Sequence, residues 1–142
     1  MSAAGLTLSP SARRMKIRCW PDLPEAAFSN LLDGCITWKP VFDNNFELAV
    51  GDIEYDPQNA NIVYAGTGDP NMPSIVYNGN GLYKSIDAGE TWQYSGLDQA
   101  GIVAKVVVDP VNSQNLYVAT MGNPYVRDNN RGVYKSTDGG AT

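Results

Sequence analysis

The sequence predicts an all-β fold built from repeated units of four short antiparallel strands. Three observations carry this prediction. The 142 residues include 14 Gly, 9 Pro and 8 Tyr, a composition typical of short strands separated by turns. Two stretches of the chain are each repeated without a gap, and a tight-turn motif recurs in phase with these repeats.

The first repeated stretch is IEYDPQNANIVYAGT at 53–67, which matches VVVDPVNSQNLYVAT at 106–120 with an offset of 53. The second is GLYKSIDAGET at 81–91, which matches GVYKSTDGGAT at 132–142 with an offset of 51. Internal similarity at a nearly fixed period is typical of proteins built from stacked structural repeats.

The two units differ mainly in the connector between these stretches. It is 13 residues long in the first unit and 11 in the second. Residues 37–43 also resemble 91–98, which indicates a partial earlier copy. Four strands per unit of about this period are typical of the blades of a β-propeller.

Each expected strand has a recognisable end. The first strand of each unit stops at Asp-Pro, because proline cannot donate a ladder hydrogen bond. The second strand carries Val, Tyr and Ile or Leu, and the third begins at Gly-(Leu/Val)-Tyr-Lys-Ser. The expected strands are 48–55, 61–67, 81–85 and 91–94 in the first unit, and 102–108, 115–120 and 132–136 in the second.

The turn after the third strand carries the most specific motif. It resembles the Asp-box (BNR) repeat, Ser-x-Asp-x-Gly-x-Thr-Trp. The Asp side chain can accept hydrogen bonds from turn amides, the Gly can take positive φ, and the Ser and Thr hydroxyls can bridge the hairpin. We expect a structural role in closing the turn, with catalysis or calcium binding as the alternative. The first copy comprises Ser85, Asp87, Gly89, Thr91 and Trp92, and the second Ser136, Asp138, Gly140 and Thr142.

The predicted organisation is one complete blade with parts of two others. Residues 37–142 form the partial propeller, with units at about 44–98 and 99–142. Residues 1–36 are an atypical N-terminal segment or the degenerate remnant of a blade. Because a closed propeller needs about 4–8 blades, we expect this chain to be a fragment that completes its propeller with missing blades or by self-assembly.

Composition excludes several function classes. A net charge of −5 argues against nucleic-acid binding, and no apolar run is long enough to span a membrane. The absence of His removes histidine-based nucleophile activation and most zinc sites. We expect no catalytic residue, cofactor or metal site. Cys19 and Cys35 could pair in an oxidising compartment or remain free thiols, and no signal peptide is visible.

Strand alternation predicts which end of the propeller binds a ligand. The Asp-Pro turns and the Asp boxes share one end and keep their length. The variable connectors share the other end, and variable loops on a rigid scaffold commonly carry binding. Aromatic and Arg side chains dominate binding hot spots. The candidate partner-binding residues are therefore Tyr77, Tyr125 and Arg127.

Among Asp-box families, the repeat looks most like the sortilin-type propellers. That resemblance implies a secreted, cell-surface or lumenal domain that binds protein, peptide or glycan ligands and is not an enzyme. Sialidase-like and xyloglucanase-like glycoside hydrolases share the architecture and remain the alternative. Asp52, Glu54 and Asp69 are available carboxylates, but none lies in a catalytic motif. An intracellular assembly factor is a third class.

Overall fold

The chain folds into two antiparallel β-sheets. The computed structural model describes residues 40–45, 49–71, 77–127 and 129–142. These residues form one sheet of four strands and one of three, with no α-helix among them. The all-β prediction is confirmed, whereas the expectations for the N-terminal segment, including Cys19 and Cys35, concern residues outside the described ranges.

The first sheet has the strand order β1-β2-β3-β4, and each neighbouring pair is antiparallel. β1 stops where predicted, because Asp56 begins the turn: its amide donates to the Ile62 carbonyl at 3.0 Å. β4 begins two residues later than predicted, because Thr91 is held in the preceding turn by Asp87. The strands are β1 (Val50–Tyr55), β2 (Val63–Thr67), β3 (Leu82–Ser85) and β4 (Gln93–Gly96).

The second sheet repeats this arrangement with three strands in the order β5-β6-β7. Asp109 closes the equivalent turn, its amide donating to the Asn115 carbonyl at 3.0 Å. A short 3-10 helix, η2 (Asp98–Ala100), joins the two sheets. The strands are β5 (Ile102–Val108), β6 (Leu116–Gly122) and β7 (Gly132–Ser136).

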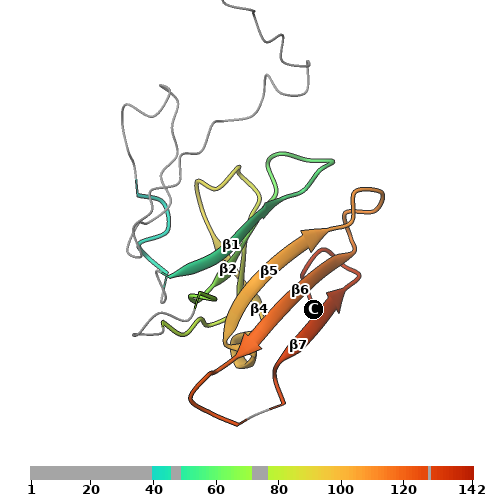
Figure 1. Cartoon of the computed structure of the whole chain (residues 1–142). Coiled ribbons are helices and arrows are strands. Elements are labelled where there is room, and N and C mark those ends of the chain that lie inside the picture. The colour runs from blue at the N-terminus through green and yellow to red at the C-terminus, as the bar shows by residue number, and fades with distance from the viewer. Residues whose placement is uncertain (1–39, 46–48, 72–76, 128) are drawn as a thin grey trace, which may run out of the picture.

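The main core lies between the two sheets, where β5 runs alongside β1 and β2 (Figure 1). Gly66 allows the close approach: a Cβ built at this position would lie 2.2 Å from the Cγ1 atom of Val103. No larger residue fits there without moving the sheets apart. The buried core residues are Tyr64 and Leu82 from the first sheet and Val103, Val106, Val108, Leu116 and Val118 from the second.

A second apolar cluster covers the opposite face of the first sheet. Phe42 is buried there against Ala65 and Tyr83, with Trp92 packed beside it. The Phe42 ring meets the Tyr83 and Trp92 rings edge to face, with centroids 5.2 and 5.4 Å apart. Such aromatic pairs contribute stabilisation beyond the area they bury. Phe42 therefore packs on the face of the first sheet that points away from the second sheet.

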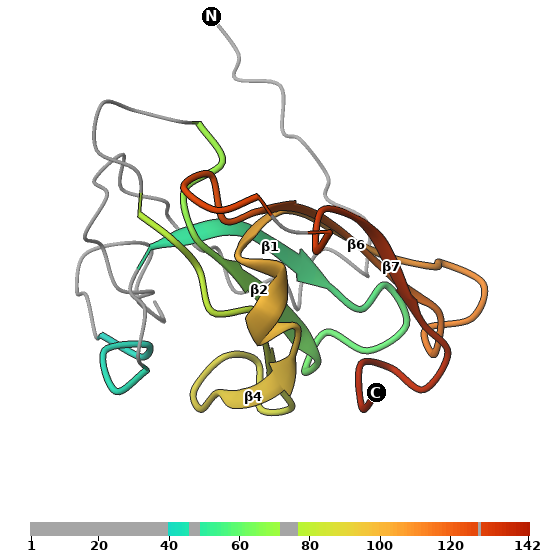
Figure 2. The same ribbon diagram turned by 90° about the horizontal axis from the view of Figure 1, so that it is seen from below.

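The connections gather at two ends of the sheets. Figure 1 shows the turns after β1 and β5 at the upper end and the β6–β7 connection at the lower end. In Figure 2 the C-terminal turn and β4 lie on the same side of the molecule, and the Ser95 hydroxyl donates to the Gly140 carbonyl. We call the end with residues 56–62, 86–92, 109–115 and 137–142 the turn end, and the end with the described parts of 68–81, 97–101 and 123–131 the loop end.

Candidate functional site

The first Asp box is a turn closed by its own side chains. The Asp87 carboxylate accepts from the Thr91 amide at 2.9 Å, from the Thr91 hydroxyl at 2.5 Å and from the Ser85 hydroxyl at 2.7 Å. Ser85 Oγ in turn accepts from the Gly89 amide at 2.7 Å. Gly89 has φ of +84°, the conformation predicted for it. Both Asp87 oxygens are thus bound within the turn.

The second Asp box repeats this network. The Asp138 carboxylate accepts from the Ser136 hydroxyl at 2.6 Å, from the Thr142 hydroxyl at 2.5 Å and from the Thr142 amide at 3.1 Å. The Gly140 amide donates to Ser136 Oγ at 2.9 Å, and Gly140 has φ of +81°. The same hydrogen-bonding geometry among four residues therefore forms in the turn of each sheet.

These hydrogen bonds keep the two box carboxylates ionised. Burial alone would raise the pKa of Asp87, but the hydrogen bonds from Thr91 and Ser85 outweigh it and lower the pKa from 3.8 to about 2. Hydrogen bonds from Ser136 and Thr142 hold the pKa of Asp138 well below its ordinary range. A general acid needs a raised pKa, so both groups are tuned in the opposite direction.

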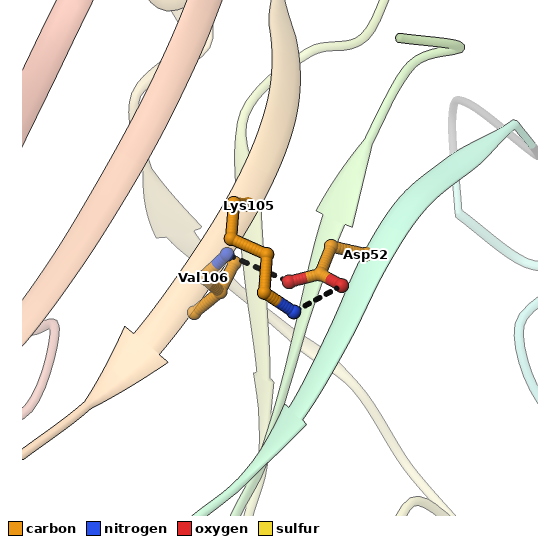
Figure 3. Close-up of polar contacts among 3 residues, drawn as sticks. All are labelled: Asp52, Lys105 and Val106. Carbon is orange, nitrogen blue, oxygen red and sulfur yellow. Dashed lines mark hydrogen bonds and ion pairs between the residues drawn. The ribbon is translucent and has the colours of Figure 1, made fainter. Parts of the chain in front are cut away.

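A polar cluster joins β1 to β5 across the seam between the sheets (Figure 3). The Asp52 carboxylate accepts from the Val106 backbone amide at 2.7 Å and pairs with Lys105 Nζ at 2.9 Å. The hydrogen bond to Asp52 raises the pKa of Lys105. Burial raises the pKa of the neighbouring Glu54, with the charge of Lys105 opposing this and that of Asp52 adding to it. Asp52 thus links the two sheets.

A second seam contact joins the Asp-Pro turns at the turn end. The buried Asp56 carboxylate accepts from the Ser113 hydroxyl at 2.6 Å. The Gln58 side-chain amide donates to the carbonyls of Pro110 and Val111 at 3.2 and 2.8 Å. Gln58 of the first turn thus reaches the second turn, and Ser113 of the second turn reaches the first.

The sequence alone did not indicate that these side chains join the two sheets, because they differ between the repeats. Asp52 stands where the second unit has Lys105, Gln58 where it has Val111, and Ser113 where the first has Ala60. Positions that differ between otherwise matching repeats, and that carry complementary charge, are the signal that could have indicated them.

The candidate binding residues lie at the loop end. Tyr77 and Tyr125 are both exposed large side chains, and Arg127 is exposed as well. The backbone fixes their loops: the Tyr77 carbonyl accepts from the Asp69 amide at 3.0 Å, and the Tyr125 amide donates to the Asn123 side chain at 2.9 Å. Within the described residues no hydrogen bond or ring contact joins Tyr77 to Tyr125. The two tyrosines share an end of the molecule without forming one contiguous cluster.

Across the described ranges, no group of three or more Cys, Asp or Glu side chains lies where it could hold a metal ion. The same ranges contain no helix with the length and apolar character needed to cross a membrane. No protein-family model matches this chain, and no curated protein matches it at a significant level.

Proposed function

We propose that this chain belongs to an Asp-box β-propeller of the sortilin-like type, which binds a protein, peptide or glycan ligand at the loop end and is not an enzyme. One observation carries the proposal. The two repeated units form equivalent antiparallel sheets with the same box turn, and these sheets stack face to face. Stacked sheets of this kind are the building principle of propellers.

The distribution of polar groups favours binding over catalysis. The carboxylates of Asp87, Asp138 and Asp52 are all engaged by the fold itself. Glycoside hydrolysis needs two carboxyl groups that face a substrate. Tyr77, Tyr125 and Arg127 are exposed instead at the loop end, and Tyr and Arg are side chains well suited to a binding hot spot. A secreted or lumenal setting would suit this role.

The proposal is tested by screening the full chain against a printed glycan array and a random-peptide display library. The affinity of the selected ligand is then measured for wild type and for Tyr77→Ala, Tyr125→Ala and Arg127→Ala. We expect at least one substitution to weaken binding by about tenfold or more. Val111→Ala, an exposed position at the turn end, is the matched control and should leave the affinity unchanged.

Two results would contradict the proposal. A ligand whose affinity depends on the turn end and not on the three loop residues would place the binding surface elsewhere. Turnover of fluorogenic glycosides by the wild type, abolished by Asp52→Asn in a protein that remains folded, would favour the glycosidase alternative.

A further inference from the structure

The outer face of the second sheet is apolar and exposed. Val133 on β7 is 73% exposed, Val107 on β5 is 45% exposed, and Tyr117 on β6 is 37% exposed. Ala119 and Lys135 alternate onto the same face of β6 and β7. We call these five residues the docking face. β6 and β7 lie on the side of the molecule away from the first sheet (Figure 1).

The docking face repeats, position by position, a face that is buried in the first sheet. The corresponding residues of the first sheet face the second sheet or lie where the two sheets meet. In order, Val107, Tyr117, Ala119, Val133 and Lys135 correspond to Glu54, Tyr64, Gly66, Leu82 and Lys84. Four of the five pairs keep the same residue or the same class of side chain.

The polar pair on the buried face has a defined acceptor. Tyr64 Oη and Lys84 Nζ both donate to the Gly139 carbonyl, at 2.9 and 2.7 Å, in the box turn of the second sheet. The Lys84 ammonium also lies over the Tyr64 ring, 5.4 Å from its centroid. The Gly139 carbonyl of the second Asp box is therefore one of the polar contacts by which the first sheet holds the second.

The docking face already holds the same pair in the same arrangement. Lys135 Nζ lies over the Tyr117 ring, 5.6 Å from the centroid, against 5.4 Å for the buried pair. In the part of the chain that the structure describes, neither Tyr117 Oη nor Lys135 Nζ donates a hydrogen bond. The donors are pre-organised for a carbonyl that none of the described residues supplies.

We propose that the docking face binds the first sheet of a second copy of this chain, so that Tyr117 and Lys135 donate to the Ala88 carbonyl of that copy. This inference rests on the proposed repeat architecture and not on the proposed ligand. Ala88 is the counterpart of Gly139 in the repeat. The two residues have nearly equal φ, +61° and +66°, and each donates its amide to the preceding Asp-Pro turn, at 2.8 and 2.9 Å.

Charge also favours a second copy as the occupant. Lys105 holds the repeat position of Asp52, and Asp52 holds that of Lys105. Head-to-tail stacking therefore places Lys105 of one copy at the Asp52 of the next, which repeats the ion pair seen within the chain.

The face of the first sheet that would contact the docking face of another copy resembles the interface between the two sheets of one chain. Leu97, at the end of β4, packs into the core between the two sheets. Phe42 is its counterpart in the partial earlier copy, and it packs on the opposite face of the first sheet. On the first sheet of a second copy, Phe42 would therefore take the place that Leu97 takes between the two sheets of one chain.

Several contacts that join the two sheets within the chain have no equivalent between two copies. Val111 replaces the donor Gln58, Ala60 replaces the donor Ser113, and Ala119 replaces the closely packed Gly66. The association is therefore weaker than the packing within the chain, and it depends on protein concentration. Because the contact is head to tail, it produces closed rings or open chains instead of symmetric dimers.

A cysteine pair tests the geometry directly. A Cβ built at Gly66 lies 2.7 Å from the Cβ of Val103, and the intermolecular counterparts of these positions are Ala119 and Val50. With the native cysteines changed to serine, Ala119→Cys/Val50→Cys should form covalent dimers and larger species under mild oxidation, since a disulfide needs Cβ atoms about 4 Å apart. The single variants Ala119→Cys and Val50→Cys, in the same background, are the matched controls and should form no covalent species larger than a dimer, because each chain then carries one thiol.

Sedimentation velocity over a range of concentrations tests the energetics. We expect wild type to self-associate, Val133→Asp to be monomeric, and Tyr117→Phe to weaken association by roughly three- to tenfold. Circular dichroism checks that Val133→Asp remains folded, as the exposure of Val133 predicts.

Three results would overturn the inference: a wild type that stays monomeric at high concentration, association that Val133→Asp leaves intact, or oxidation of the double-cysteine variant that gives no species larger than those of the single-cysteine controls. Ligand affinity measured on monomeric Val133→Asp separates a failure of this inference from a failure of the proposed function, because the loop end is unchanged in that variant.

Discussion

The two sheets have nearly the same sequence in their third strands but opposite environments. Leu82 in the first sheet is 2% exposed, whereas its counterpart Val133 in the second is 73% exposed. Tyr64 is buried between the sheets, and its counterpart Tyr117 faces outward. The strand pattern sets which side chains share a face, but a neighbouring sheet decides whether that face is buried.

The largest expected effect comes from truncating these counterparts. Leu82→Ala should lower the free energy of unfolding by about 2–5 kcal/mol, because it leaves a cavity between the sheets. Val133→Ala should change it by less than about 0.5 kcal/mol, as most exposed substitutions do. Urea denaturation of dilute, monomeric protein measures both. Equal losses would mean that the second sheet is covered in solution even as a monomer.

The box turns are the feature that the two sheets share, and they give a smaller effect. Asp87→Ala should lower the free energy of unfolding by about 1–3 kcal/mol, because the Thr91 amide and the hydroxyls of Ser85 and Thr91 lose their acceptor. Asp138→Ala should be destabilising in the same direction. Ligand affinity at the loop end should stay unchanged in both variants. Loss of binding in a stably folded Asp87→Ala protein would assign the box a functional role.

The smallest effect is a dependence of stability on pH. The folded pKa of Asp87, about 2, lies below its unfolded value of about 3.9. A depressed pKa means that the carboxylate stabilises the fold above about pH 4 and loses this contribution as the pH falls towards about 2. Urea midpoints of wild type and Asp87→Ala should therefore converge across that range. A constant difference between the two midpoints would show that the charge of Asp87 is unimportant.

Sequence reasoning predicted the elements well, because their limits are local. Asp-Pro ends β1 and β5, and the box residues close the turns after β3 and β7. The start of β4 was two residues off, because Thr91 could belong to a strand or to the turn and its hydrogen bonds to Asp87 favour the turn. β2 also begins two residues later than expected, at Val63, and β6 continues two residues further, to Gly122, so local chemistry predicted the strands and turns but not every boundary.

The contacts between the sheets could not be predicted in the same way. Asp52 meets Val106, and Gln58 meets Val111, across more than 50 residues of chain. Nothing in the local pattern marks these side chains as joining residues. The burial of Phe42 was missed for the same reason, since its partners Ala65 and Tyr83 come from later strands. Pairings of this kind depend on the stacking distance and register of the sheets.

The Asp52–Lys105 pair also bears on how a chain of similar repeats avoids assembling in the wrong order. Repeat proteins are prone to domain swapping and misassembly during folding, since each unit offers its neighbours much the same surface. Here two equivalent positions carry opposite charges. Pairing two first sheets would bring aspartate against aspartate, and pairing two second sheets would bring lysine against lysine. Opposite charges meet only where a first sheet packs against a second sheet, so this one ion pair favours the correct order of the sheets.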